Sequence, residues 1–264
     1  MKTPVIISAF NEELRISETL RSLPSETEPI VAVNGSNDKT AEIARSFGAQ
    51  VLEIEEQGKF PAFQKALGSL GQRALEPLIM LDADTRPIHP MRWHNRFLHE
   101  LDVRGDNPTV ISGPVWFTSE KGNNIEPVVR SLFRMSQALL TQKSAVHTGL
   151  NGGQYGANQG VRIAHQEVLD RVMGLDHFWP MEDVAFAEVI AKSEGGSFVQ
   201  LVQRDLMAYT PQSDAFPPLQ YYLTHGFNKA TDYTIAAYNN RGAKGSHPFT
   251  ATKPASNDEK ELGV

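Results

Sequence analysis

The sequence predicts an α/β fold with a mostly parallel, doubly wound central sheet flanked by helices. Two observations support this prediction. Short apolar runs rich in β-branched residues alternate with segments of helical period through the first third of the chain, with short loops between them. One of these runs, Pro77–Leu81, ends abruptly in Asp82 and Asp84, as a buried strand does at its carboxyl tip. Alternation with short loops implies right-handed crossovers and therefore parallel strands.

Each element of the first half has a local signal. Strands are expected at Val5–Ala9, Ile30–Val33, Gln50–Ile54 and Leu78–Leu81. Helices are expected between them, at Glu12–Leu23, Thr40–Phe47 and, after a short loop, Gly58–Leu70. Asn11 is predicted to cap the first helix and Pro24 to end it, because an Asn side chain caps well and proline breaks a helix. Gly48 suits the position just after the second helix.

The second half is less regular. Strands are expected within Thr109–Phe117, Ser197–Leu201 and Leu206–Tyr209. Helices are expected at Ile125–Gln142, His165–Met173 and Glu182–Lys192. The Gly- and Asn-rich segment Thr148–Gly160 is predicted to be a loop that lets backbone approach a ligand, because glycine leaves room for close contact.

Composition excludes several classes of protein. The formal net charge of −6 argues against a general nucleic-acid binder, which usually has a basic field, so nucleic acid is an unlikely partner. The chain has no cysteine, so any metal must bind to oxygen or imidazole, and we expect a cytoplasmic location. No run approaches the roughly 20 apolar residues of a transmembrane span, so any membrane contact is expected to be peripheral.

Asp82 and Asp84 are the strongest candidate site residues. Open α/β sheets bind ligands beyond the carboxyl ends of their strands, which is where both side chains should lie. Two carboxylates there suit a hard divalent cation, and such a cation suits a diphosphate. A solvated strand end is the alternative explanation of the same pattern.

Six segments in this order and spacing resemble family-2 glycosyltransferases of the GT-A fold. They are Ser8–Glu13, Asn34–Thr40, Gly58–Leu67, Asp82–Asp84, Gly156–Arg162 and Glu182–Asp183. The resemblance covers about residues 4–210. It implies a single GT-A-like domain at 1–240, with a nucleotide-binding half at 1–105, an acceptor half at 106–240 and a flexible tail at 241–264.

The resemblance also implies a reaction. A nucleotide-diphospho-sugar donor would bind with Mg²⁺ or Mn²⁺, held chiefly by Asp84, while Asp82 would reach the ribose or a metal-bound water. Asp183, with Glu182 beside it, would be the general base that takes a proton from the acceptor hydroxyl. One displacement at the anomeric carbon would invert its configuration. The acceptor stays open between a glycan, a lipid-linked sugar and a small molecule.

Further residues could contact the donor on the same resemblance. They are Phe10, Asn11, Glu12, Asn34, Lys59, Ala83, Asn158, Arg162 and Trp179. Each also has an ordinary structural explanation: Asn11 and Glu12 could serve the first helix, Lys59 could be a surface lysine, and Asn158 and Arg162 could brace a loop.

The chain departs from the family at Val33-Asn34, where many members carry an acidic pair whose first acid contacts the base in enzymes that use uridine nucleotides. A valine side chain accepts no hydrogen bond, which puts UDP in doubt as the donor nucleotide. Two other functions remain open: a non-catalytic nucleotide- or glycan-binding protein on the same fold, and a sugar-nucleotidyltransferase. The acidic turn at Glu12 and Glu13 disfavours the latter, because a triphosphate needs a basic cradle.

Overall fold

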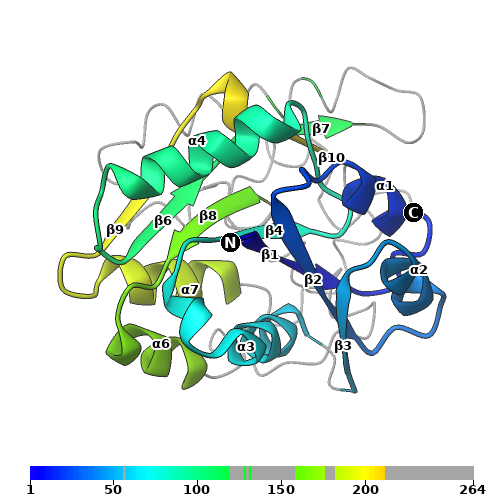
Figure 1. The fold of residues 1–264 in the computed structure, drawn as a ribbon, viewed down its shortest axis with the longest axis horizontal. Helices are drawn as coiled ribbons and strands as arrows, with labels where there is room; N and C mark the ends of the chain where they lie inside the picture. Colours follow the sequence, from blue (N-terminus) through cyan, green and yellow to red (C-terminus); the bar gives the residue numbers. More distant parts are fainter. Residues whose placement is uncertain (56–57, 119–127, 129–130, 132–157, 176–181, 212–264) are drawn as a thin grey trace, which may run out of the picture.

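The computed structural model describes residues 1–55, 58–118, 128, 131, 158–175 and 182–211, with backbone only at 182–185. Seven strands form one sheet in the order β3-β2-β1-β4-β8-β6-β9 (Figure 1). Its strands are β1 (Thr3–Ala9), β2 (Thr27–Asn34), β3 (Gln50–Ile54), β4 (Leu78–Asp82), β6 (Thr109–Ser112), β8 (Asn158–Arg162) and β9 (Ser197–Gln200). All neighbours pair in parallel except β8, which runs antiparallel to both β4 and β6. The predicted mostly parallel α/β sheet is confirmed, and it joins strands from both halves of the chain.

Helices cover both faces of this sheet (Figure 1). They are α1 (Ile16–Arg21), α2 (Thr40–Ser46), α3 (Lys59–Leu70), α4 (Pro90–Asp102), α6 (Gln166–Met173) and α7 (Glu182–Ala191). One apolar cluster unites α3, α6 and α7 with one face, and a second unites α1, α2 and α4 with the other. Phe63 of α3 and Phe186 of α7 meet edge to face, with ring centroids 4.8 Å apart. This two-sided burial explains why the central strands are apolar on both faces.

A small second sheet, which the sequence did not predict, joins one short strand of the first half to two strands of the second half. Its strands are β5 (Arg86–Pro87), β7 (Val115–Thr118) and β10 (Ala208–Pro211), in the order β5-β10-β7. The segment predicted as one β-rich run at Thr109–Phe117 is therefore two strands in different sheets. Gly113 allows the bend, since a Cβ there would lie 2.6 Å from Asn158 Nδ2 and 2.7 Å from the Leu206 carbonyl oxygen. The strand expected at Leu206–Tyr209 begins only at Ala208, after a 3₁₀ turn at Arg204–Leu206.

Several predicted boundaries shift. Helix α1 begins at Ile16 rather than Glu12, with Arg15 at its N-cap position, so Asn11 does not cap it. Helix α4 was not predicted, although Pro90 at its start and the spacing of Trp93, Phe97 and Leu101 are helical signals. The helix expected at Ile125–Gln142, most of the loop at Thr148–Gly160 and the tail at 241–264 lie outside the described residues.

Candidate functional site

The carboxyl ends of β1, β2 and β4 meet at one edge of the sheet. Ser8 of β1 pairs with Asp82, the last residue of β4, and Ala9 pairs with Val33 of β2. The loops that follow these strands are therefore neighbours although they are distant in sequence. This is the edge at which open α/β sheets bind ligands.

Lys59 and Asp82 form an ion pair at this edge. Lys59 Nζ lies 2.6 Å from Asp82 Oδ1, and both side chains are partly exposed. Lys59 is the first residue of α3, and the residue before it, Gly58, has a φ of 139°. Asn34 at the end of β2 fixes this turn, because its Nδ2 donates to the Gly58 carbonyl oxygen at 2.8 Å. The lysine is thus placed by β2 and directed at the end of β4.

Asp84 lies deeper in the site. Its Oδ1 accepts hydrogen bonds from the hydroxyls of Thr85 and Thr210, each at 3.2 Å. Burial raises the pKa of Asp84 above its ordinary value, and these hydrogen bonds and the positive charges of Arg15 and Lys59 only partly oppose the rise. A buried carboxylate that its own surroundings do not fully compensate is a good ligand for a cation.

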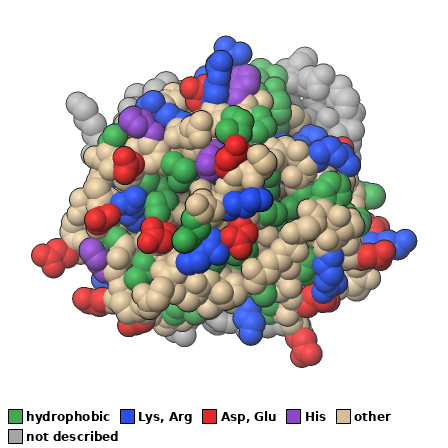
Figure 2. Space-filling model, in the orientation of Figure 1, with side chains coloured by type: hydrophobic (Ala, Val, Ile, Leu, Met, Phe, Trp, Pro, Cys, Tyr) green, Lys and Arg blue, Asp and Glu red, His purple; other side chains and the backbone are tan. Residues whose placement is uncertain are grey.

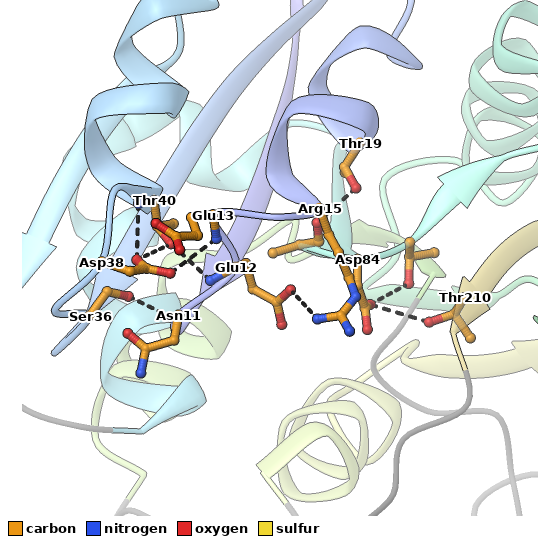
Figure 3. A network of polar contacts seen from close by, with 12 residues as sticks. Asn11, Glu12, Glu13, Arg15, Thr19, Ser36, Asp38, Thr40, Asp84 and Thr210 are labelled. Carbon is orange, nitrogen blue, oxygen red and sulfur yellow. Dashed lines mark hydrogen bonds and ion pairs between the residues drawn. The ribbon is translucent and has the colours of Figure 1, made fainter. Parts of the chain in front are cut away.

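Glu12 is the third carboxylate of the site. Burial and the nearby negative charges of Asp84 and Asp82 raise its pKa from 4.5 to about 7. Arg15 opposes this shift, with its Nη1 3.3 Å from Glu12 Oε2. Figure 3 shows Arg15 between Glu12 and Asp84, with its guanidinium directed toward both side chains. Glu12, Asp82 and Asp84 therefore act electrostatically as one cluster.

Asn11 links the loops that follow β1 and β2. It has a positive φ of 54°, a conformation that asparagine tolerates better than most residues. Its backbone N–H donates to Ser36 Oγ at 2.9 Å, and its Oδ1 accepts from the Asn37 N–H at 3.0 Å. The next residue, Glu12, donates its N–H to Thr40 Oγ1 at 2.8 Å (Figure 3). These bonds fix the backbone from which the Glu12 side chain projects.

The Asn158 side chain holds parts of the fold together and does not point into the site. It is fully buried, accepts from Trp93 Nε1 at 2.7 Å and donates to the Leu206 carbonyl oxygen at 2.6 Å. These partners lie on α4 and the 3₁₀ turn at Arg204–Leu206, so Asn158 joins β8 to the α4 side of the sheet. These hydrogen bonds agree with a role for Asn158 in bracing the fold, so Asn158 is not a proposed contact of the nucleotide-sugar.

Arg162 lies at the opposite end of β8 from Asn158. Since β8 is antiparallel to β4, Asn158 pairs with Leu81 near the site, whereas Val161 pairs with Leu78 at the far end of β4. Arg162 Nη1 donates to the Gly105 carbonyl oxygen at 2.6 Å and to Asp106 Oδ1 at 2.9 Å. The expected donor contact of Arg162 does not fit this position, and we leave Arg162 out of the site.

The remaining predicted site residues are Phe10, Ala83, Trp179 and the pair Glu182 and Asp183. Phe10 follows β1 and is 42% exposed. Ala83 is buried, and its carbonyl oxygen accepts a hydrogen bond from Thr19 Oγ1 at 2.7 Å. This bond holds the backbone between Asp82 and Asp84 against α1. Glu182 and Asp183 are the first two residues of α7, but their side chains lie outside the description, as does the whole of Trp179.

The cluster fits Mg²⁺ or Mn²⁺ by its chemistry. These cations prefer oxygen ligands, and magnesium is commonly held by one or two carboxylates together with substrate phosphates. Asp84 and Asp82 supply such oxygens. Within the described ranges, no group of three or more His, Cys, Asp or Glu side chains is arranged to hold an ion.

Two residues of the site could not be identified from the sequence. Arg15 is one of many surface-type arginines in the sequence, and nothing in its spacing marks it as a partner of Glu12. Thr210 lies 126 residues from Asp84, and only the pairing of β10 with β5 and β7 brings it close.

One face of the molecule is mixed in charge. Figure 2 shows acidic and basic side chains intermixed over the viewed face of the molecule. None of the helices in the described part of the chain has both the length and the apolar character needed to cross a bilayer.

Comparison with curated proteins finds glycosyltransferases. The chain is 33% identical over 112 residues to a dolichyl-phosphate hexose transferase of Haloferax volcanii, a match that covers 41% of this chain and 46% of that protein. It is 31% identical over 130 residues to the glycosyltransferase AglE of the same organism, covering 45% and 40%. The matches thus span less than half the length of these relatives.

Solved structures share the fold. A glucosyl-3-phosphoglycerate synthase of Mycobacterium tuberculosis, crystallised with Mn²⁺, UDP and phosphoglyceric acid, superposes with a TM-score of 0.54 at 16% identity. The match covers 89% of this chain and 78% of that one. A crystal of the same enzyme with Mg²⁺ and UDP gives a TM-score of 0.51 at 19% identity, covering 89% and 79%. Residues 5–127, a little under half of the chain, match the model of glycosyl transferase family 2 and are similar to that family, and the solved structures share the fold of the chain.

Proposed function

We propose that the protein is a metal-dependent glycosyltransferase that moves one hexose from a nucleotide-diphospho-sugar to an acceptor hydroxyl, with inversion. The observation that supports this most directly is the convergence of Asp82, Asp84, Glu12 and Lys59 at the carboxyl edge of the sheet. These residues come from three separate elements, and each side chain has the charge that a metal-diphosphate site requires.

Asp84 and Asp82 are the proposed ligands of Mg²⁺ or Mn²⁺. Bound there, the cation would neutralise the diphosphate as it leaves with additional negative charge. The hydroxyls of Thr85 and Thr210 orient Asp84, which keeps an oxygen in position without adding charge. Lys59, now paired with Asp82, provides a positive charge beside the phosphates.

Asp183 is the proposed general base, with Glu182 beside it at the start of α7. In the proposed step the acceptor oxygen bonds to the anomeric carbon, the bond from that carbon to the diphosphate oxygen breaks, and the acceptor proton passes to the Asp183 carboxylate. A single displacement of this kind inverts the anomeric configuration. Trp179, a few residues earlier, is a proposed stacking surface for a sugar ring.

The nucleotide and the acceptor remain open in this proposal. The structural neighbour was crystallised with UDP, but Val33 offers no side-chain acceptor for the uracil of this donor. The curated relative is named for a dolichyl-phosphate acceptor, so a lipid-linked acceptor reached from the cytoplasmic side of a membrane is one candidate. A glycan and a small phosphorylated metabolite are the others.

Nucleotide-induced thermal stabilisation tests the proposal. The protein is heated with UDP, GDP, ADP, CDP or TDP, each with and without Mn²⁺. We expect one nucleoside diphosphate to raise the melting temperature, and only with metal. Asp84→Ala should abolish this shift. If none of the five nucleotides shifts the wild-type protein, the proposed donor site is wrong.

Turnover separates an enzyme from a binding protein on the same fold. Asp183→Asn should retain metal-dependent nucleotide binding but reduce transfer by about 100-fold or more, because the base is lost and the donor site is not. Normal transfer by this variant would remove Asp183 from the mechanism. Release of pyrophosphate from a nucleoside triphosphate and a sugar phosphate would instead reveal a nucleotidyltransferase.

A further inference from the structure

We propose that Gln159 forms the floor of a subsite that binds the ring hydroxyls of the transferred sugar, an inference that rests on the proposed function. Gln159 is fully buried in strand β8, which lies between β4 and β6. Neither its Nε2 nor its Oε1 has a hydrogen-bond partner in the described part of the chain. A buried amide with both ends unsatisfied costs stability, so a ligand that satisfies them is the natural explanation.

Gln159 belongs to a row of buried polar side chains. Ser112 of β6 pairs in register with Gln159 on one side and with Gln200 of β9 on the other. Residues in lateral register point to the same face of a sheet, so the three side chains form a line across adjacent strands. All three residues are at most 3% exposed. The row lies at the carboxyl end of β6 and β9, the same edge as Asp82.

The apolar neighbours identify the face on which this row lies. Val110 precedes Ser112 by two residues, Val161 follows Gln159 by two and Phe198 precedes Gln200 by two. All three belong to the apolar cluster that includes residues of α3 and α7. The row is therefore on the α3 and α7 face and interrupts an otherwise apolar layer at its end. Asn158, whose side chain bonds to Trp93 of α4 and to the Leu206 carbonyl oxygen, faces the other way.

The row connects the two halves of the proposed reaction centre. At one end, Gln159 pairs with Met80, and Asp82 follows Met80 by two residues on the same face, where it meets Lys59 of α3. At the other end, α7 packs on β9 and β6 and is joined to β9 by a short loop at 192–196, so it runs opposite to β9. Its first residues, Glu182 and Asp183, therefore lie toward the Gln200 end.

A sugar between the diphosphate and the base would lie along this row. Adjacent strands are about 4.8 Å apart, so the row from β8 to β9 spans about 10 Å, enough for one pyranose ring. A glutamine amide offers both a donor and an acceptor, which suits neighbouring sugar hydroxyls that need both. A site built to bond hydroxyls discriminates strongly, because a wrong epimer leaves its polar groups unpaired.

The test compares wild type with Gln159→Met, which keeps the length of the side chain but removes its amide. The probes are the nucleoside diphosphate that binds best in the thermal screen and its glucose, mannose and galactose esters, all with Mn²⁺. We expect the diphosphate to bind both proteins equally. The added affinity contributed by the preferred sugar should fall about tenfold or more in the variant, and the discrimination between the three epimers should collapse.

The melting temperature of the unliganded variant separates this role from a structural one. Replacing an unsatisfied buried amide with an apolar group should leave stability unchanged or raise it. Met80→Leu, a volume-conserving swap beside Gln159, is the matched control and should alter neither sugar affinity nor epimer preference.

Each result has a separate meaning. If the wild-type protein binds no nucleoside diphosphate with metal, the proposed function fails. If it does bind one and Gln159→Met keeps the wild-type ratio of sugar-ester to diphosphate affinity, this inference alone is overturned. A large loss of melting temperature in Gln159→Met would likewise overturn it, because the amide would then have partners within the protein.

Discussion

The hydroxyl of Thr210 lies 3.2 Å from Asp84 Oδ1, although 126 residues separate the two in sequence. This contact joins the small sheet β5-β10-β7 to the acidic cluster at the edge of the large one. The Thr85 hydroxyl donates to the same oxygen, so two neutral hydroxyls orient one carboxylate. Orientation of a metal ligand by its hydrogen-bond partners typically changes metal affinity by about 10–100-fold.

Thr210→Val should therefore weaken Mn²⁺ binding by about tenfold in the presence of the nucleoside diphosphate, because Asp84 keeps its charge but loses a fixing hydrogen bond. Titration calorimetry measures the change. Thr118→Val is the control, since the Thr118 hydroxyl donates only to the Thr210 carbonyl oxygen in the same small sheet. Equal Mn²⁺ affinities in the two variants would show that the hydroxyl of Thr210 does not position Asp84.

The raised pKa of Glu12 predicts a dependence of stability on pH. A carboxyl with a pKa of 4.5 when unfolded and about 7 when folded stabilises the fold fully below pH 4.5, and this contribution is lost as the pH rises through 7. In metal-free buffer, Glu12→Gln should therefore flatten the decline of unfolding free energy between these pH values. The effect is at most about 3.5 kcal/mol, since one pKa unit is worth about 1.4 kcal/mol.

Urea unfolding of both proteins at several pH values measures this effect. Asp84, whose pKa burial also raises, should retain part of the decline in the variant. Glu42→Gln, on the exposed surface of α2, should reproduce the wild-type curve. A Glu12→Gln curve parallel to that of wild type would mean that Glu12 ionises normally in the folded protein.

The first half of the fold could be predicted because its signals are local. The bounds of β3 were predicted to the residue, and Asp82 was placed at the end of β4, since apolar runs, glycines and prolines mark these elements. The prediction failed at Asn11, where a positive φ and bonds to Ser36 and Asn37 replace a helix cap. Those partners lie in another loop, which no local pattern reveals.

The candidate site was predictable only in part for the same reason. Asp82, Asp84, Glu12 and Lys59 follow strands or start a helix, so topology alone brings them to one edge. Gln159 is adjacent to Asn158, and only the register of β8 with β6 shows that one faces the α3 side and the other α4. The face of the sheet to which a side chain points depends on the register in which its strand pairs with its neighbours, and the sequence alone does not give this register.

Lys59 should matter for binding more than for folding. Its ion pair with Asp82 is partly exposed, and such pairs contribute at most about 1 kcal/mol to stability. Lys59→Met should therefore shift the unfolding free energy little but weaken nucleoside diphosphate binding about tenfold, because a positive charge is removed from beside the phosphates. Lys65→Met, on the exposed face of the same helix, is the control. Loss of affinity in both variants alike would indicate only a general change in charge.

Trp93 should show the opposite pattern, a loss of stability without a loss of metal binding. It is fully buried, meets Phe97 edge to face with ring centroids 5.5 Å apart, and donates from Nε1 to Asn158 Oδ1. Trp93→Phe should lower the unfolding free energy by about 2–4 kcal/mol, because it opens a cavity and leaves a buried acceptor unpaired. Trp116→Phe, at a half-buried position of β7, should cost less than about 1 kcal/mol. Equilibrium urea unfolding gives both values, and calorimetry with Mn²⁺ and nucleotide should give wild-type affinity for Trp93→Phe, since Asn158 faces α4 rather than the acidic cluster. Equal free energies of unfolding for the two variants would show that the hydrogen bond between Trp93 and Asn158 does not hold β8 against α4.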